Sequence, residues 1–143
     1  MSLALRPVAR VRVEVGDEFD VARVIGAVQH LCTAHGMSPL FAAHVATAAS
    51  ELANNLWMHA ERGGQVSLEI LARGAAAGVE LVAEDDGPGI ADLPQALAEG
   101  FSTGGGLGCG LPGVQRLMDQ FTIDSAPGRG TRVVARKWSS PSR

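Results

Sequence analysis

The 143-residue chain contains no tyrosine, only two cysteines, and few aromatic residues of any kind (4%). It has no apolar run long enough to cross a bilayer, and its first residues lack the charged and apolar blocks of a secretory signal. Its basic residues are scattered and the net charge is −3, which argues against nucleic acid as the main partner. Cys32 and Cys109 lie far apart in sequence, so we expect a cytoplasmic protein with free thiols.

Several well-known active-site motifs are also absent. No G-x-x-x-x-G-K-[ST] phosphate loop is present, and the four histidines form no H-E-x-x-H pair and have no cysteine partners, so a structural zinc site is not expected. Gly108, Gly110 and Gly113 have the spacing of a dinucleotide-binding fingerprint. Because no strand is expected just before them, we interpret this match as chance.

Hydrophobic residues make up 46% of the chain, which predicts that residues 1–143 fold as a single domain, with a frayed tail at 139–143. Alternation of polar and apolar residues predicts strands, and apolar spacing of three and four predicts helices. Expected strands cover 10–15, 65–70, 79–84, 121–123 and 131–135. Expected helices run from a cap at Asp17 to a stop at Gly36, from a cap at Ser38 to about Ala60, and over 111–120. Gly74 and Gly78 are expected to frame a turn between two of these strands. This order indicates an α+β sandwich and not a doubly wound parallel sheet.

The stretch from Glu84 to Gly113 contains two glycine-rich turns around a short acidic segment. Glycines let a backbone approach a ligand closely, and a helix that begins after such a turn offers free N–H groups to phosphates. Asp85 ends an expected strand with the inward parity of Val79, Leu81 and Ala83. The pattern suggests a nucleotide with its base at Asp85 and its phosphates at the glycines, although acidic residues before Gly-Pro-Gly are also common turn formers.

The second expected helix carries Glu51, Asn55 and His59 at spacings of four, so they share one face beside the apolar stripe. Asn54 adds a second amide. These residues could simply face solvent, and the helix alone does not decide the question. The functional interpretation is that Glu51 accepts a proton and Asn55 gives an oxygen ligand to Mg²⁺, which needs few protein oxygens when phosphates and waters supply the rest.

Four motifs together resemble those of the GHKL ATPase superfamily, which includes gyrase, chaperones, histidine kinases and MutL. The similarity covers about residues 10–138 and rests on Glu51-x-x-x-Asn55 (the N-box), Asp85-x-Gly87-x-Gly89, the glycines from Gly104 to Gly110, and Gly128-x-Gly130-Thr131. The resemblance implies a two-layer α/β sandwich of the Bergerat, histidine-kinase-like type. Its sheet would be mixed but mostly antiparallel and covered by helices on one face.

Within the superfamily, the chain most resembles the small serine/threonine kinases of bacterial partner-switching modules, including the stressosome switch kinase, through residues 87–92, 102–108, 111–114 and 116–119. The resemblance implies that ATP and Mg²⁺ bind and that a STAS-domain antagonist is phosphorylated, with possible exchange onto a PP2C-type phosphatase. It makes Glu51 the catalytic base, Asn55 the metal ligand, and Asp85 and Thr131 the adenine contacts. The remaining nucleotide contacts would come from Gly87, Gly89, Gly104, Gly105, Gly106, Leu107, Gly108 and Gly110.

Three other functions stay open at this point. The chain could be an anti-sigma-like module that binds ATP and sequesters a partner, an ATPase without a protein substrate, or a catalytic fragment of a histidine kinase. No histidine in the chain is followed by Glu or Asp, as a phosphoacceptor histidine usually is, which disfavours the last. Cys109 stands where a larger aliphatic residue is expected among the glycines, which could make this segment sensitive to thiol reagents.

Overall fold

A computed structural model describes residues 4–60, 62–89 and 110–139. The described residues form five strands and three helices in the order that the sequence predicts. The strands are β1 (Arg6–Val15), β2 (Gly64–Arg73), β3 (Ala76–Asp85), β4 (Gln120–Ser125) and β5 (Thr131–Ser139). The helices are α1 (Phe19–Ala34), α2 (Pro39–His59) and α4 (Leu111–Leu117).

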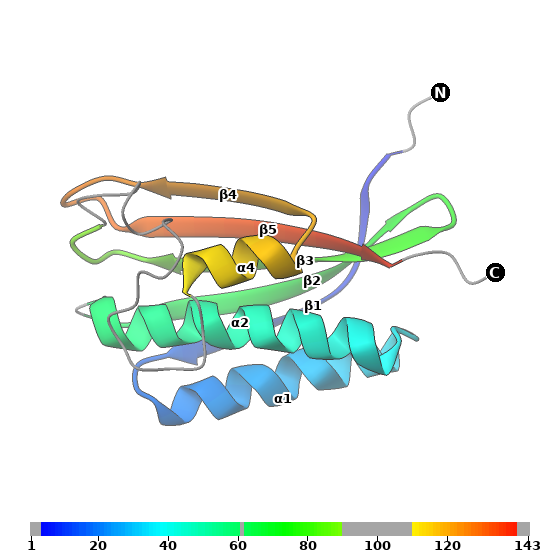
Figure 1. The fold of residues 1–143 in the computed structure, drawn as a ribbon, viewed down its shortest axis with the longest axis horizontal. Helices are drawn as coiled ribbons and strands as arrows, with labels where there is room; N and C mark the ends of the chain where they lie inside the picture. The colour runs from blue at the N-terminus through cyan, green and yellow to red at the C-terminus, as the bar shows by residue number, and fades with distance from the viewer. Residues whose placement is uncertain (1–3, 61, 90–109, 140–143) are drawn as a thin grey trace.

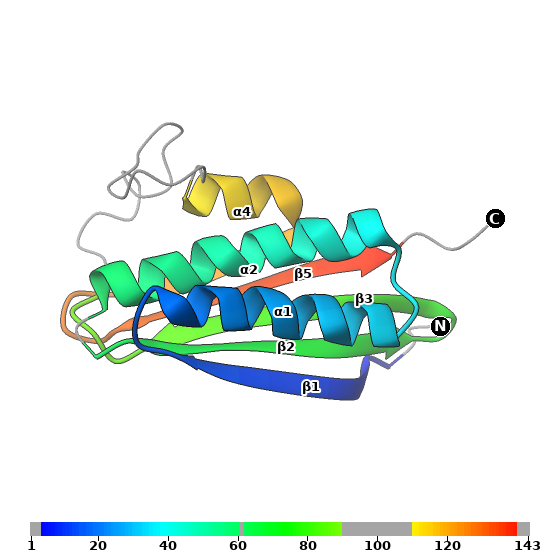
Figure 2. The ribbon, with the colours of Figure 1, turned by 90° about the horizontal axis from the view of Figure 1, so that it is seen from below.

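The strands form one sheet in the order β1-β2-β3-β5-β4, and the three helices lie on one of its faces (Figures 1 and 2). A mixed, mostly antiparallel sheet was expected. All four pairings are antiparallel, so the described sheet is antiparallel throughout. Helices α1 and α2 run side by side in opposite directions across it (Figure 2). The two-layer α+β sandwich is therefore confirmed.

The core lies between α1, α2 and the inner face of the sheet. Alternate residues of β2 and β3 point inward because side chains in a strand change face at every residue. On α2, residues at helical spacing are almost fully buried against them, and burial of this stripe is the main force that holds the two layers together. The most deeply buried side chains include Val45, Leu52, Leu68, Val79, Leu81, Val24 and Val28.

Helix boundaries agree with the sequence at α2 and differ elsewhere. Ser38 caps α2 by accepting a hydrogen bond from the Phe41 amide at 3.1 Å. The N-cap position of α1 is Glu18 and not Asp17, although the Asp17 carboxylate accepts from the Phe19 amide at 2.9 Å. Helix α4 ends at Leu117, earlier than expected.

Three details of the strands also differ from expectation. β1 begins already at Arg6, and Ser139, expected to be frayed, ends β5 opposite Ala77. Gly78 lies inside β3 and does not frame the turn. A Cβ at Gly78 would come within 2.6 Å of the Trp138 indole on the neighbouring strand, and the Arg73 guanidinium lies 5.0 Å from the centroid of this ring. Gly78 is thus needed to make room for an aromatic side chain.

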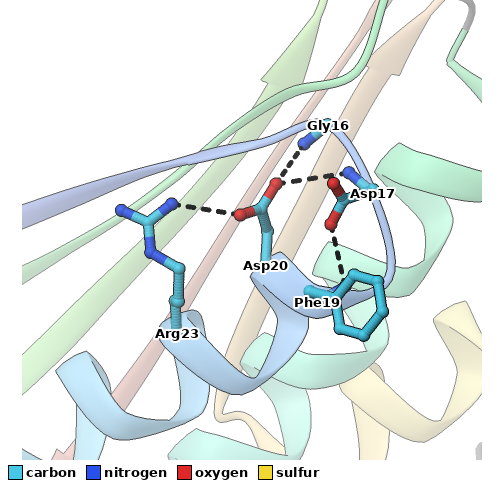
Figure 3. A network of polar contacts seen from close by, with 5 residues as sticks. All are labelled: Gly16, Asp17, Phe19, Asp20 and Arg23. Carbon is cyan, nitrogen blue, oxygen red and sulfur yellow. Dashed lines mark hydrogen bonds and ion pairs between the residues drawn. The ribbon is translucent and has the colours of Figure 1, made fainter.

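A carboxylate network fixes the first turn of α1 (Figure 3). The Asp20 carboxylate accepts from the amides of Gly16, at 2.8 Å, and Asp17, at 3.2 Å, and pairs with Arg23 at 3.0 Å. The Gly16 amide, Arg23 and the Asp17 amide together lower the pKa of Asp20. The ionised form therefore supports the turn from β1 into α1.

This network makes a testable contribution to stability. Because the pKa of Asp20 is lower in the folded chain, its contribution is present above the unfolded pKa and is lost as the pH falls through the folded pKa. We expect Asp20→Asn to lower the Tm by a few degrees at pH 7 and to differ less from wild type as the pH approaches 3. Thermal unfolding followed by circular dichroism at several pH values measures this. Glu14→Gln, which removes an exposed carboxylate, is the control and should change little.

Cys32 is a free thiol that is fully buried between the helices and the sheet, and burial raises its pKa to about 11. This confirms the free thiol expected for Cys32, whereas Cys109 lies outside the described residues. No helix in the part of the chain that the structure describes is long and apolar enough to cross a membrane.

Candidate functional site

The candidate site lies at the end of the molecule where α2 ends and where β3 meets β5 (Figure 1). Asp85 is the last residue of β3, and its register partner is Thr131, the first residue of β5. Leu81 and Ala83, which share the parity of Asp85, are buried under the helices. The predicted parity is therefore confirmed, and Asp85 lies on the face of the sheet that α2 covers.

The half-buried Asp85 carboxylate is held by the loop that follows it. Its Oδ1 accepts from the Gly87 amide at 2.7 Å. Burial raises the pKa of Asp85, the Gly87 amide opposes that rise, and the charge of Asp86 adds to it. Among the described residues, no hydrogen bond to the second oxygen, Oδ2, is found, so this oxygen can accept one from a ligand.

Two glycines hold the end of α2 against Asp85. A Cβ at Gly87 would lie 2.8 Å from Asp85 Oδ1 and 3.3 Å from the Cα of Ala60, which caps α2. A Cβ at Gly64 would lie 2.9 Å from Leu56 of α2 and 3.1 Å from the Cβ of Asp85. The absence of side chains at these two positions lets the last turns of α2 lie next to the carboxylate.

The other side of Asp85 is formed by the turn between β4 and β5. Gly130 has a φ of +78°, and a Cβ there would meet the Asp85 carbonyl oxygen at 2.2 Å. Gly89 likewise has a φ of +78° and packs against the carbonyl of Ala126, and the Gly128 amide donates to Pro88 at 2.7 Å. The loop after β3 and the β4–β5 turn are thus joined next to the site by a hydrogen bond and by close backbone packing.

Sequence reasoning did not single out Ser125 at the end of β4. Its Oγ lies 2.7 Å from Thr131 Oγ1, and it donates to the Gly130 carbonyl at 3.1 Å. When Ser125 donates to Gly130, the Thr131 hydroxyl donates to Ser125 and keeps its lone pairs for a ligand donor or a water. No local signal in the sequence could have found it, because Ser125 faces Thr131 only through the register between β4 and β5.

On α2, the structure distinguishes the two adjacent asparagines. Asn54 Oδ1 accepts from the Trp57 indole N–H at 2.9 Å, so the oxygen of this amide is already engaged by a side chain of the same helix. Asn55 is half-buried and lies one turn beyond Glu51 on α2. Among the described residues no hydrogen bond of the Asn55 side chain is found, so this amide is the one that could hold a metal ion, and that role stays a prediction.

Glu51 of α2 lies next to the beginning of α4. Its side chain is half-buried, and this burial raises the pKa of the carboxyl, while a hydrogen bond from the backbone N–H of Gly110 lowers it. Gly110 precedes α4 with a φ of +61°. The structure thus brings the proposed base to the point where the glycine-rich segment ends. The other predicted contacts in that segment, Gly104, Gly105, Gly106, Leu107 and Gly108, lie outside the described residues.

A pocket of about 440 Å³ opens at the same end of the sheet. Its lining includes Glu14, Gln65 and Glu84, which belong to the face of the sheet opposite α2. Asp85 and Asp86 also line this pocket, so it reaches the candidate site, but its several carboxylates would repel the phosphates of a nucleotide. We do not assign a nucleotide to it.

Comparison with known proteins identifies the fold family. Residues 15–137 match the family model of the histidine kinase-like ATPase domain. The chain belongs to this family. The match runs from the last residue of β1 to Lys137 in β5, and it confirms the fold expected from the four motifs.

Individual relatives agree with this assignment. The chain is 40% identical over 126 residues to the serine/threonine-protein kinase RsbT of Bacillus subtilis, covering 88% of this chain and 94% of that protein. It is 30% identical over 101 residues to the anti-sigma F factor of a Thermoanaerobacter species, covering 67% of this chain and 69% of that protein.

A solved structure has the same fold. It is the histidine kinase domain of the blue-light-activated histidine kinase from Erythrobacter litoralis, with a TM-score of 0.51 and 22% identity. The match covers 84% of this chain but only 59% of that chain.

Proposed function

We propose that the chain transfers the γ-phosphate of ATP to a serine or threonine hydroxyl of a protein partner. The observation that carries the proposal is the 40% identity, over nearly the whole of both chains, to a protein named as a serine/threonine-protein kinase. The placement of Glu51 and Asn55 on the second half of α2 and of Asp85 at the end of β3 supports it, because each residue supplies a different part of the required chemistry.

The described residues fit ATP and Mg²⁺. Asp85 offers a half-buried hydrogen-bond acceptor, which the exocyclic amino group of an adenine requires. The glycines beside it lie where a side chain would not fit. Asn55 offers an amide oxygen, the kind of ligand that Mg²⁺ takes when phosphates and waters complete its shell. Mg²⁺, when bound, would neutralise charge on the phosphates.

In the proposed mechanism, Asp85 Oδ2 accepts from the adenine amino group, and the Thr131 hydroxyl binds the same ring edge directly or through a water. Gly87 and Gly89 shape the loop beside the ring. Backbone amides from Gly104 to Gly110 hold the phosphates. As the partner's hydroxyl oxygen bonds to the γ-phosphorus, the bond from that phosphorus to the β–γ bridging oxygen breaks and ADP leaves. Glu51 accepts the proton that the hydroxyl loses, and the raised pKa of Glu51 brings it closer to that of an effective base.

The partner that we propose is a STAS-domain antagonist, with exchange onto a PP2C-type phosphatase as a second partner, in the cytoplasm of a bacterium. The relatives named as a kinase and as an anti-sigma factor support a partner-switching role of this kind. Such exchange requires an interface that is formed and released, and transient signalling interfaces can be small.

A phosphotransfer assay tests the proposal. The purified chain is incubated with γ-labelled ATP, Mg²⁺ and STAS-domain proteins recovered from the source organism by pull-down. We expect label on a serine or threonine of one partner, and we expect Asn55→Ala to abolish it by removing the metal ligand. Asn54→Ala, which alters the neighbouring amide that is bonded to Trp57, should retain transfer. Absence of label with a partner that binds the chain would refute the kinase assignment.

A second candidate function is sequestration, in which ATP is a structural ligand and no transfer occurs. The 30% identity to an anti-sigma F factor favours it. The same assay separates the two, since a sequestering module would bind its partner in an ATP-dependent manner and leave it unlabelled. Phosphate release without any partner would instead indicate an ATPase that has no protein substrate.

A further inference from the structure

The chain segment that leaves α4 is bonded to three consecutive residues of β5. The carbonyl of Arg136 accepts from the Asp119 amide at 2.8 Å, and the amide of Trp138 donates to Asp119 Oδ2, also at 2.8 Å. Between them, the Nζ of Lys137 donates to the carbonyl of Leu117, the last residue of α4, at 2.8 Å. These bonds explain why α4 stops at Leu117, because residue 119 is already attached to the sheet.

Lys137 is an unusual residue for its position. It has the inward parity of Val133 and Ala135, which are buried, and it pairs with the buried Val79. Its ammonium group lies 5.9 Å from the centroid of the Phe41 ring of α2. A cation on this face needs compensation, and the carbonyl at the end of α4 and the aromatic ring provide it.

Helix α4 is therefore held at both ends by side chains from other elements. At its beginning, Glu51 of α2 accepts from the Gly110 amide, and at its end Lys137 of β5 donates to Leu117. The helix has only seven residues, so its internal hydrogen bonds do little to fix its position along its axis. Its position depends on what holds the two ends.

We propose that Lys137 is a positioning residue for phosphotransfer. By holding the end of α4, it sets where Gly110, the last glycine of the proposed phosphate-binding segment, lies relative to Glu51. The consequence for catalysis rests on the proposed function, whereas the consequence for α4 does not. The two consequences can be measured separately.

The first measurement is amide hydrogen exchange in the nucleotide-free chain. Lys137→Met keeps a side chain of similar length and removes the charge and the donor. We expect exchange at Gly113 and Val114, whose amides bond to the Gly110 carbonyl, to become about tenfold faster, as expected when a hydrogen bond to a charged group is lost. Lys137→Arg, which can still donate, should exchange at nearly the wild-type rate.

The matched control is Arg136→Met. Arg136 is the adjacent residue, is also a cation, and pairs with Glu80 at 2.7 Å on the opposite face of the sheet. The Arg136→Met substitution removes a cation that is about as buried as Lys137, and the Arg136 side chain does not contact the end of α4. Amide exchange in α4 should therefore be unchanged. Equal protection of Gly113 and Val114 in wild type and Lys137→Met would overturn the positioning role, whatever the function of the chain.

The second measurement is nucleotide binding, by calorimetry at a temperature where every variant is folded. We expect Lys137→Met to weaken ATP about fivefold and to leave adenosine unaffected, since the adenine contacts at Asp85 and Thr131 are on other elements. A lower Tm with unchanged ATP affinity would show that Lys137 supports the fold alone and would overturn the link to phosphate binding. Failure of the wild type to bind ATP would count against the proposed function, and the exchange result would still decide the role of Lys137 in α4.

Discussion

Glu51→Gln is expected to slow phosphotransfer by about 10²- to 10⁴-fold while ATP still binds. Glutamine has nearly the same shape and can still accept a hydrogen bond from the Gly110 amide, so α4 should keep its place. What the variant loses is the ability to take a proton from the partner's hydroxyl. Single-turnover transfer to the partner measures the rate, and calorimetry with ATP and Mg²⁺ measures the affinity.

The same substitution is expected to raise the Tm of the nucleotide-free chain at neutral pH. Burial raises the pKa of Glu51 in the folded state, so the folded chain releases this proton less readily than the unfolded chain does. Any favourable contribution of the protonated form is present below the unfolded pKa and is lost as the pH rises through the folded pKa. At pH 7 the ionised carboxylate therefore opposes folding, and glutamine removes that cost.

A loss of activity with a gain in stability is a combination that general damage to the fold does not produce. Glu80→Gln provides the comparison, because it weakens an ion pair with Arg136 and should lower the Tm without affecting transfer. If Glu51→Gln transfers phosphate at the wild-type rate, Glu51 is not the base. The wild-type rate should also fall as the pH drops through the raised pKa of Glu51, because only the ionised form can accept a proton.

Much of the architecture could be predicted from sequence because the signals were local. Ser38 followed by Pro39 marked the beginning of α2, and the inward parity of Asp85 followed from two-residue alternation along β3. The errors arose where a distant element determines the local structure. Gly78 resembled a turn residue, yet it is glycine because Trp138 packs over it from another strand. Helix α4 was expected to be longer, and bonds from β5 end it.

The positions of the candidate site residues could be predicted to a similar depth, whereas their roles stay predictions. Glu51, Asn55 and Asp85 were accessible to sequence reasoning because spacing and parity place each of them on a known face. Ser125 and Lys137 were not, since their importance depends on which strands are neighbours and in what register. The distinction between Asn54 and Asn55 also needed the structure, because the Trp57 side chain decides it. A single amino-acid sequence does not reveal the register between strands that are far apart along the chain.

Asp85→Asn is expected to weaken ATP binding about 10- to 100-fold. The Gly87 amide can still donate to the Asn oxygen, so the loop should be preserved, but the second atom of the group changes from an acceptor to an NH₂ donor. That donor would face the amino group of adenine, which is also a donor. Calorimetry with ATP and Mg²⁺ gives the affinity. Asp86→Asn is the matched control, since no such bond to this neighbouring exposed carboxylate is found within the part of the chain that the structure describes, and the affinity of this variant for ATP should equal that of wild type.

Thermal unfolding with and without ATP provides a second test of the same assignment. Burial raises the pKa of Asp85, so its ionised form opposes folding at pH 7, and Asp85→Asn should raise the Tm of the nucleotide-free chain. Saturating ATP should raise the Tm of wild type by mass action and should raise that of the variant much less. The order of the two melting temperatures is then expected to reverse when ATP is added. An equal ATP-dependent shift in both proteins would mean that adenine binds elsewhere, and Asp85 would lose its proposed role as the adenine contact.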